Sequence, residues 1–265
     1  MSGSDILRTH VDGDGVATLT MNRPKVHNAF NADLIAALDA AFRRLGSDGH
    51  VRVIVLRGEG ASFSAGGDLA DMKAAAAAGP AENEADAGRL SAMLHSLNTV
   101  PKPTIALVHG SAFGGGVGLV ACADIAVAAA AAQFALTEVR LGLIPAAISP
   151  YVLAAMGARA ARRYVLTGER FDAATAQSLG LVHQVVDSPD ALQDAARKHV
   201  QALLAGGPQA LADAKALIFD IAGRPIDAAL RQDTARRIAR VRAGAEAREG
   251  ISAFFDKRAA NWVRR

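Results

Sequence analysis

The sequence contains a single cysteine, Cys122, among its 265 residues. One thiol excludes an intramolecular disulfide framework and indicates a reducing compartment, so we expect a cytoplasmic protein. Residues 1–5 carry no apolar stretch, and no secretory signal is expected. The longest stretch without charge, residues 103–123, is long enough to cross a bilayer. It contains Pro103 and several glycines, which favour a buried turn between two elements over a membrane span.

Neither sign of charge dominates, and the common metal and nucleophile motifs are missing. Lys plus Arg total 29 and Asp plus Glu total 26, giving a net charge of +3. That excess is too small to indicate a nucleic-acid binder but is compatible with an anionic small ligand. The seven histidines show no paired helical spacing and no cysteine partners, so no metal site is expected. The segment around Ser62 and Ser64 lacks the second glycine of a nucleophile elbow.

What the chain does contain is an alternation of strand and helix patterns, with 51% apolar residues. Residues 6–10 and 16–21 flank the Asp-Gly-Asp-Gly turn at 12–15, which predicts a β-hairpin. Asn31 is expected to cap a helix that ends at Gly46. Further apolar runs predict buried strands at residues 51–56, 104–108, 125–128 and 182–186.

The remaining patterns predict helices and, together with the strands, indicate an α/β fold. Asp68 is expected to cap a helix, with Asp71 as the acid of a capping box. Residues 74–88, rich in alanine and acids, are expected to form a loop or a weakly held helix, and residues 90–97 an amphipathic helix. From residue 190 onward the pattern is helical. Strands alternating with helices, followed by a helical tail, predict an α/β fold with a C-terminal helical segment.

Two glycine-bearing turns, residues 64–68 and 113–116, each follow a strand and precede a helix. Small residues let a ligand approach the backbone, and amides at a helix start are unpaired. One amide from each turn could hold an oxygen that gains negative charge, although both could also be simple tight turns. Residues 116–121 partly match a dinucleotide fingerprint. A helix there would be only about two turns long, which is short for that crossover.

Segments in the right order and spacing over nearly the whole chain resemble the enoyl-CoA hydratase/isomerase (crotonase) family. They include FSAGGDL at 63–69, FGGG at 113–116 and LGLIP at 141–145. The other matching segments are residues 22–24, 28–29, 102–106, 123–125, 134–138 and 249–258.

The resemblance implies a crotonase-like spiral of ββα units over residues 1–195 and a C-terminal helical trimerisation segment over residues 196–265. Trimers, or hexamers built from them, would be the assembly. The substrate would be an acyl-CoA thioester, with no separate cofactor because CoA enters as part of the substrate. No nucleic-acid or membrane partner is expected.

The family's site residues carry over to this sequence position by position. The oxyanion hole would consist of the amides of Gly67 and Gly115, and Glu138 would be the acid/base. The resemblance also assigns substrate contacts to Ala65, Gly66, Asp68, Gly114, Gly118, Phe254 and Lys257. Phe254 and Lys257 would reach the nucleotide end of CoA, usually in a neighbouring subunit; a solvated helical face is the alternative for both.

The sequence departs from the family pattern at two places. Hydratases usually carry a glutamate two residues after the triple glycine, where this chain has Gly118, so a two-glutamate clamp on water is absent. The loop at residues 146–150 lacks the usual glycines. Both features resemble the bacterial methylglutaconyl-CoA and carboxygeranoyl-CoA hydratase branch, whose substrates are branched and carry a second carboxylate. Gly118 would make room for bulk, and Arg140 would pair with that carboxylate or form a surface salt bridge.

The sequence therefore predicts an enzyme that adds water to a 2-enoyl-CoA, with methylglutaconyl-CoA as the named substrate. A Δ3,Δ2-enoyl-CoA isomerase that uses the same glutamate is the alternative. A third possibility is a non-catalytic RNA-binding family member. The scattered positions of Trp262, Tyr151 and Tyr164 do not support base stacking.

Overall fold

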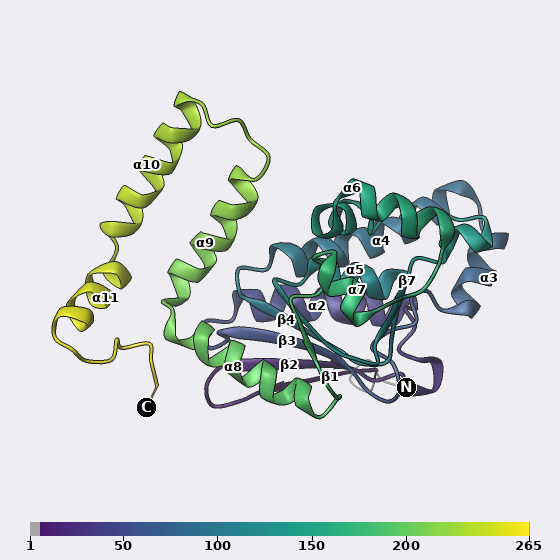
Figure 1. The fold of residues 1–265 in the computed structure, drawn as a ribbon, viewed down its shortest axis with the longest axis horizontal. Helices are drawn as coiled ribbons and strands as arrows, with labels where there is room; N and C mark the ends of the chain where they lie inside the picture. The colour runs from purple at the N-terminus through teal and green to yellow at the C-terminus, as the bar shows by residue number, and fades with distance from the viewer. Residues whose placement is uncertain (1–5, 265) are drawn as a thin grey trace.

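The computed structural model describes residues 6–264 and has two sheets wrapped by helices, with a helical arm on one side (Figure 1). The segment in which no signal was expected, residues 1–5, lies outside the described residues. Within the described part, no helix combines the length and the apolar character that a bilayer crossing requires.

The larger sheet has six strands in the order β1-β2-β3-β4-β6-β9. The predicted hairpin is present, because β1 and β2 pair antiparallel with Leu7 opposite Met21. All other neighbours in this sheet are parallel. The bounds are β1 Leu7–Val11, β2 Val16–Met21, β3 Val53–Gly58, β4 Thr104–Val108, β6 Ile125–Ala129 and β9 Gln184–Val186.

A second sheet of three short strands was not predicted. It has the order β5-β7-β8 and consists of Ser111–Phe113, Gln133–Ala135 and Phe171–Asp172. Segments of two or three residues are too short to show a period of two. Phe134 and Phe171 stack at a centroid distance of 5.6 Å and hold β7 against β8.

Helices cover both faces of the larger sheet. One core cluster joins the sheet to α2, α4, α5 and α6, and a second joins its other face to α8. The bounds are α2 Ala32–Ser47, α3 Leu69–Ala77, α4 Pro80–Thr99, α5 Gly115–Cys122, α6 Ser149–Thr167, α7 Ala173–Ser178 and α8 Ala191–Ala205. The expected α/β class is confirmed by this arrangement.

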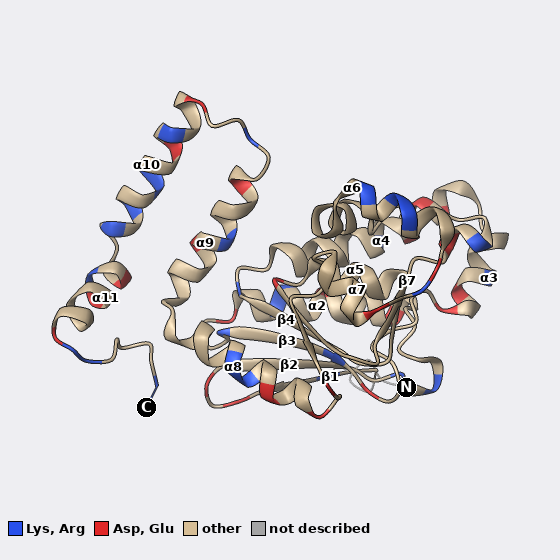
Figure 2. Cartoon of the chain, viewed as in Figure 1, with Lys and Arg blue, Asp and Glu red and all other residues tan. Residues whose placement is uncertain are grey.

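The last three helices, α9 (Pro208–Ile221), α10 (Ala228–Arg242) and α11 (Ala245–Phe255), form the arm. Its base is tied to the core by Lys215, whose Nζ lies 2.8 Å from Asp124 Oδ2. Figure 2 shows the arginines spread along α10 among acidic residues. Residue 195 falls inside α8, which packs on the sheet, so the helices that leave the core begin with α9.

Two local expectations need correction, and a third is decided between its two alternatives. Gly46 lies inside α2, which ends at Ser47, so it does not end the helix. A side chain at Gly46 would meet Val100 Cγ2 at 2.9 Å, so the absence of a side chain allows close packing. Asp71 forms no capping box with Asp68; its Oδ2 accepts from the amide of Ala32 at 3.0 Å. For residues 74–88, expected to be a loop or a weakly held helix, the structure has the helical alternative, divided between α3 and α4.

Candidate active site

The first glycine-bearing turn is held in place by two isolated β-bridges. Ser64 bridges Ala112, with the Phe113 amide donating to Ser64 O at 2.9 Å. Gly67 bridges Phe30: the Phe30 amide donates to Gly66 O, and the Asp68 amide donates to Phe30 O. Successive amides of an extended segment point to opposite sides. The Gly67 amide therefore points away from Phe30, and it has no backbone acceptor within residues 6–264.

Asn28 holds the segment that leads into this turn. It is fully buried and adopts a left-handed conformation with φ of 54°, which asparagine tolerates better than most residues. Its Nδ2 donates to Glu59 O at 2.9 Å and to Ser62 O at 2.8 Å. The backbone of Asn28 accepts from Ser64 Oγ at 2.9 Å. The Asn28 side chain therefore fixes Glu59 and Ser62, the two ends of the segment that leads into the turn.

The second glycine-bearing turn lies directly against the first. A Cβ atom at Gly66 would lie 2.8 Å from Phe113 O and 3.5 Å from the amide nitrogen of Gly115. Gly66 and Gly114 both have positive φ, at 87° and 49°. Only glycine accepts that conformation and that crowding together. Gly115 is the first residue of α5, where a helix leaves its amide unpaired and carries partial positive charge.

Glu138 places its carboxylate beside the triple glycine. A Cβ atom at Gly114 would lie 2.9 Å from Glu138 Oε1. The other oxygen, Oε2, is buried and has no hydrogen-bond partner among the described residues. Burial raises the pKa of Glu138 above the ordinary glutamate value, and its own backbone amide offsets only part of that rise. A half-buried carboxylate with a free oxygen is suited to proton transfer.

Gly67, Gly115 and Glu138 line one cavity of about 210 Å³ between α3, α4, α5 and the loop before α6. The rest of its wall is largely apolar, with Phe30, Ile35, Met72, Leu90, Ile144 and Ile148. The structure thus brings together the three residues that the sequence assigned to catalysis. Their roles remain predictions.

Asp68 also lines the cavity, but its carboxylate is occupied. Its Oδ1 caps α3 by accepting from the Ala70 amide at 2.9 Å, and its Oδ2 pairs with Arg23 at 2.9 Å. Burial raises the pKa of Asp68, but the bonds from Ala70 and Arg23 more than offset this and leave it lowered. Ala65 donates its amide to His27 O at 2.9 Å and lies beside the cavity, not in its lining.

Gly118 lies behind the cavity wall. A Cβ atom there would be 2.3 Å from Ile148 Cγ2, so Ile148 already fills the place of a side chain. In this chain Ile148, not open space, lies beside Gly118, and the role of Gly118 in admitting a bulky substrate stays a prediction. Ile148 belongs to residues 146–150, the second place where the sequence departs from the family pattern. The two departures, Gly118 and this loop, are therefore in direct contact.

Three other predicted residues lie elsewhere in this chain. Phe254 is 79% exposed on α11, at the opposite end of the molecule from α3 (Figure 1), and Lys257 follows that helix with φ of 51°. Neither lines the Glu138 cavity. Arg140, proposed as a partner for a substrate carboxylate, packs on α6: a Cβ atom at Gly168 would lie 3.0 Å from its Nε.

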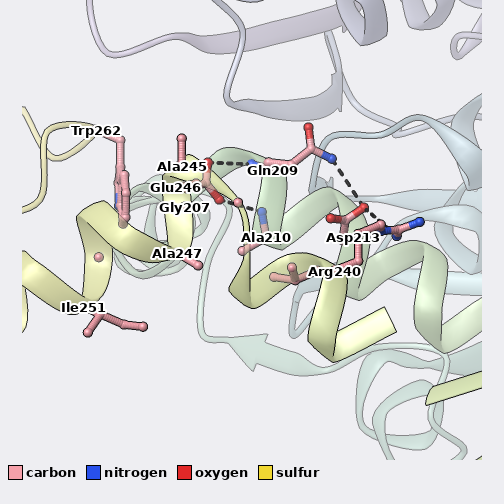
Figure 3. Close-up of a pocket in the computed structure, with 13 residues that line it drawn as sticks. Gly207, Gln209, Ala210, Asp213, Arg240, Ala245, Glu246, Ala247, Ile251 and Trp262 are labelled. Carbon is pink, nitrogen blue, oxygen red and sulfur yellow. Dashed lines mark hydrogen bonds and ion pairs between the residues drawn. The ribbon is translucent and has the colours of Figure 1, made fainter. Parts of the chain in front are cut away.

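A larger cavity of about 600 Å³ lies in the arm, between α9 and the α10–α11 pair (Figure 3). Its polar feature is Glu246, whose carboxylate accepts from the amides of Gln209 and Ala210 at 3.0 and 2.7 Å and so caps α9. Figure 3 shows these two bonds, with Trp262 at one end of the cavity. The carboxylate is satisfied, and none of the residues predicted to be catalytic lies here.

Sequence reasoning missed most of the apolar wall. Met72 lies in the helix expected after Asp68 and Leu90 in the amphipathic helix expected at 90–97, but neither was given a role at the site, and Phe30 follows the Asn28-Ala29 motif without a signal of its own. Ile144 was part of a recognised motif but was given no role. Such positions depend on how distant elements pack, which a local pattern does not reveal.

Comparison with known proteins places this geometry in a family. Residues 12–265 match the family model described as Enoyl-CoA hydratase/isomerase. A crystal structure of an enoyl-CoA hydratase from Shewanella pealeana superposes with a TM-score of 0.94 at 43% identity, over 97% of this chain and 96% of that one.

Relatives with other chemistry are similar as well. The 1,2-epoxyphenylacetyl-CoA isomerase of Escherichia coli (strain K12) is 33% identical over 96% of this chain and 97% of its own length. A 4-chlorobenzoyl coenzyme A dehalogenase of an Arthrobacter species is 38% identical over 67% of this chain and 65% of its own. The names of all three relatives refer to CoA or to a CoA thioester. The expected fold is confirmed, and the chain belongs to the enoyl-CoA hydratase/isomerase family.

Proposed function

We propose that this protein hydrates 2-enoyl-CoA thioesters, with Glu138 as the sole acid/base and the amides of Gly67 and Gly115 as the oxyanion hole. The observation that carries the proposal is the shared cavity. Glu138, whose carboxylate has one buried oxygen without a partner among the described residues, lines the same largely apolar cavity as two glycines at turns that leave their amides free.

The chemistry follows from where charge develops. Glu138 takes a proton from water as the water oxygen bonds to the β-carbon, and the electron pair of the double bond moves toward the thioester oxygen. The two amides stabilise the resulting enolate. The protonated Glu138 then returns a proton to the α-carbon and the thioester carbonyl re-forms. With glycine at position 118, the same carboxylate serves in both steps.

The Δ3,Δ2-isomerase reaction is the second candidate, because it too needs one carboxylate. Glu138 would remove an α-proton and return it at the γ-carbon through the same enolate. The observation that favours it is the glycine at position 118, packed against Ile148, which leaves no second carboxylate at that position to hold an attacking water. The dehalogenase chemistry of one relative requires attack on an aromatic ring and finds no particular support in this cavity.

The acyl chain is expected to be uncharged. The ionisable residues that line the cavity are the acids Asp68, Asp71, Asp86 and Glu138, and no lysine or arginine among the described residues joins them. Arg23 and Arg89, the arginines nearest these acids, are already paired with Asp68 and Asp86, so a second carboxylate on the acyl group would meet acids and no unpaired cation. The methylglutaconyl thioester suggested by the sequence therefore finds no counter-charge in this chain, and we propose an apolar acyl group instead.

Purified protein should remove the absorbance of the conjugated enoyl group of crotonyl-CoA as water adds to it. We expect kcat/KM for crotonyl-CoA to exceed that for methylglutaconyl-CoA because of the acidic lining. If a 3-enoyl-CoA gains conjugated absorbance while crotonyl-CoA remains unchanged, the isomerase reaction replaces hydration as the function. Faster hydration of methylglutaconyl-CoA would overturn the proposed uncharged acyl chain.

The pH dependence of kcat/KM should show the raised pKa of Glu138. The carboxylate must be ionised to accept the first proton, so activity is lost as pH falls through this pKa. Because burial raises the pKa, the acid limb should lie above the ordinary glutamate value of about 4.3. Measuring kcat/KM from pH 4 to 8 gives the pH at which activity is lost on the acid side. A limb at or below the ordinary value would show that Glu138 does not act from its buried position.

We also propose that copies of this chain associate through the arm. It exposes large apolar side chains, with Ile226 in the α9–α10 connection at 87% and Phe254 and Phe255 on α11 at 79% and 76% exposure. Exposed apolar surface of this kind is typical of protein interfaces. Assembly would also be needed for Phe254 and Lys257 to approach the site of another copy.

A further inference from the structure

Ile148 is a fixed part of the cavity wall. It precedes the first residue of α6 and is 3% exposed. Its carbonyl accepts from the amides of Tyr151 and Val152 at 3.1 and 3.0 Å, which anchors its backbone to the first turn of the helix. Ile148 is among the residues that line the cavity that holds Glu138.

The side chain of Ile148 also reaches α5. A Cβ atom at Gly118 would lie 2.3 Å from Ile148 Cγ2 and 3.0 Å from Ile148 Cβ, but only in ordinary contact, at 3.5 Å, with Leu94 Cδ2. Gly118 lies within α5 and has no positive φ. Its backbone therefore accepts any side chain, and the obstacle to a larger residue is Ile148.

We propose that Ile148 and Gly118 form one interlocked unit, and that Ile148 determines which acyl chains this enzyme accepts. This inference rests on the proposed function, because it assigns the acyl group to the Glu138 cavity. A branched side chain held against a glycine closes the α5 side of the cavity with hydrocarbon. Ile148 therefore occupies the space beside position 118, and acyl carbons cannot enter it.

The size of the effect follows from the size of the side chain. Ile148→Ala removes three carbons from the wall of a cavity of about 210 Å³. One methylene in an apolar pocket changes substrate preference by roughly 10- to 200-fold. A 3-methyl-branched acyl chain should therefore gain at least about tenfold over the straight four-carbon chain when Ile148 is shortened.

The experiment is a double-mutant cycle of Ile148→Ala and Gly118→Ala. Gly118→Ala alone should lower Tm, because its methyl group meets Ile148. In the Ile148→Ala background the same substitution should cost less, because the methyl group enters the vacated space. Ile144→Ala is the matched control. It lines the same cavity but is 75% exposed and is not among the atoms nearest a Cβ at Gly118, so it should not rescue Gly118→Ala.

Selectivity is measured without turnover, by calorimetric titration with butyryl-CoA and 3-methylbutanoyl-CoA, and with turnover by kcat/KM for the matching 2-enoyl thioesters. Ile148→Ala should shift preference toward the branched chain, and Gly118→Ala added to it should shift preference back. Additive Tm changes would overturn the interlock, and an unchanged binding preference would overturn the selectivity role. Wild-type protein that binds these thioesters but turns over no enoyl-CoA would instead count against the proposed function.

Discussion

Glu138→Gln should lower kcat by about 10²- to 10⁴-fold, the usual contribution of a general acid/base. Glutamine keeps the shape of glutamate but cannot accept the proton from water. The other acidic side chains that line the cavity among the described residues already have partners, including Asp86, which lies 2.8 Å from Arg89. Asp68 lines the cavity but is bound to Arg23 and to the Ala70 amide, and Asp71 accepts from the Ala32 amide.

Two measurements separate a lost proton acceptor from a damaged fold. Binding of butyryl-CoA, which cannot react, should change little in Glu138→Gln, because the glutamine amide occupies the same volume. The matched control is Glu169→Gln, which breaks an exposed ion pair with Arg163 and should leave kcat near wild type. Turnover retained by Glu138→Gln would assign proton transfer to another group and exclude both proposed reactions as written.

Elements with strong local signals were predicted from the sequence. The Asp-Gly-Asp-Gly turn gave the hairpin between β1 and β2, and Asn31 caps α2 by accepting from the Leu34 amide at 3.0 Å. In each case residues within three or four positions determine the conformation, so the sequence alone is informative.

The features missed by sequence reasoning depend on contacts between distant residues. Helix α6 was not predicted, and its pattern is interrupted at Gly157, which has non-helical φ of 74° and ψ of 154°. The strands of the second sheet are recognisable only by their pairing. The sequence showed that Gly118 and the loop at 146–150 were unusual, but not that Ile148 packs on Gly118, because those residues are thirty positions apart.

The residues proposed to be catalytic could be predicted from the sequence, but the side chains that surround them could not. Gly67, Gly115 and Glu138 were identified through resemblance, and the structure places them on one cavity. The free oxygen of Glu138 and the acidic lining were not foreseeable, because both depend on which side chains already have partners. Those two observations shape the proposed mechanism and the proposed acyl group.

Gly67→Pro should lower kcat by about 10²- to 10³-fold relative to Gly67→Ala, the usual effect of removing one oxyanion donor. Proline has no N–H group, so the variant lacks the donor itself. The two hydrogen bonds of the bridge to Phe30 use Gly66 O and the Asp68 amide, so neither requires the Gly67 N–H.

Gly67→Ala is the matched control because it keeps the amide. Its new Cβ would lie 2.8 Å from Met72 Cε, the far end of a flexible side chain that can move aside. Both variants should unfold at similar temperatures, and butyryl-CoA binding measures how far the proline Cδ, which takes the place of the amide hydrogen, displaces the thioester oxygen. The difference should appear in kcat, where the enolate oxygen needs both donors. Equal kcat for Gly67→Pro and Gly67→Ala would show that the Gly67 amide does not stabilise the transition state, and the oxyanion hole would then require a different pair of donors.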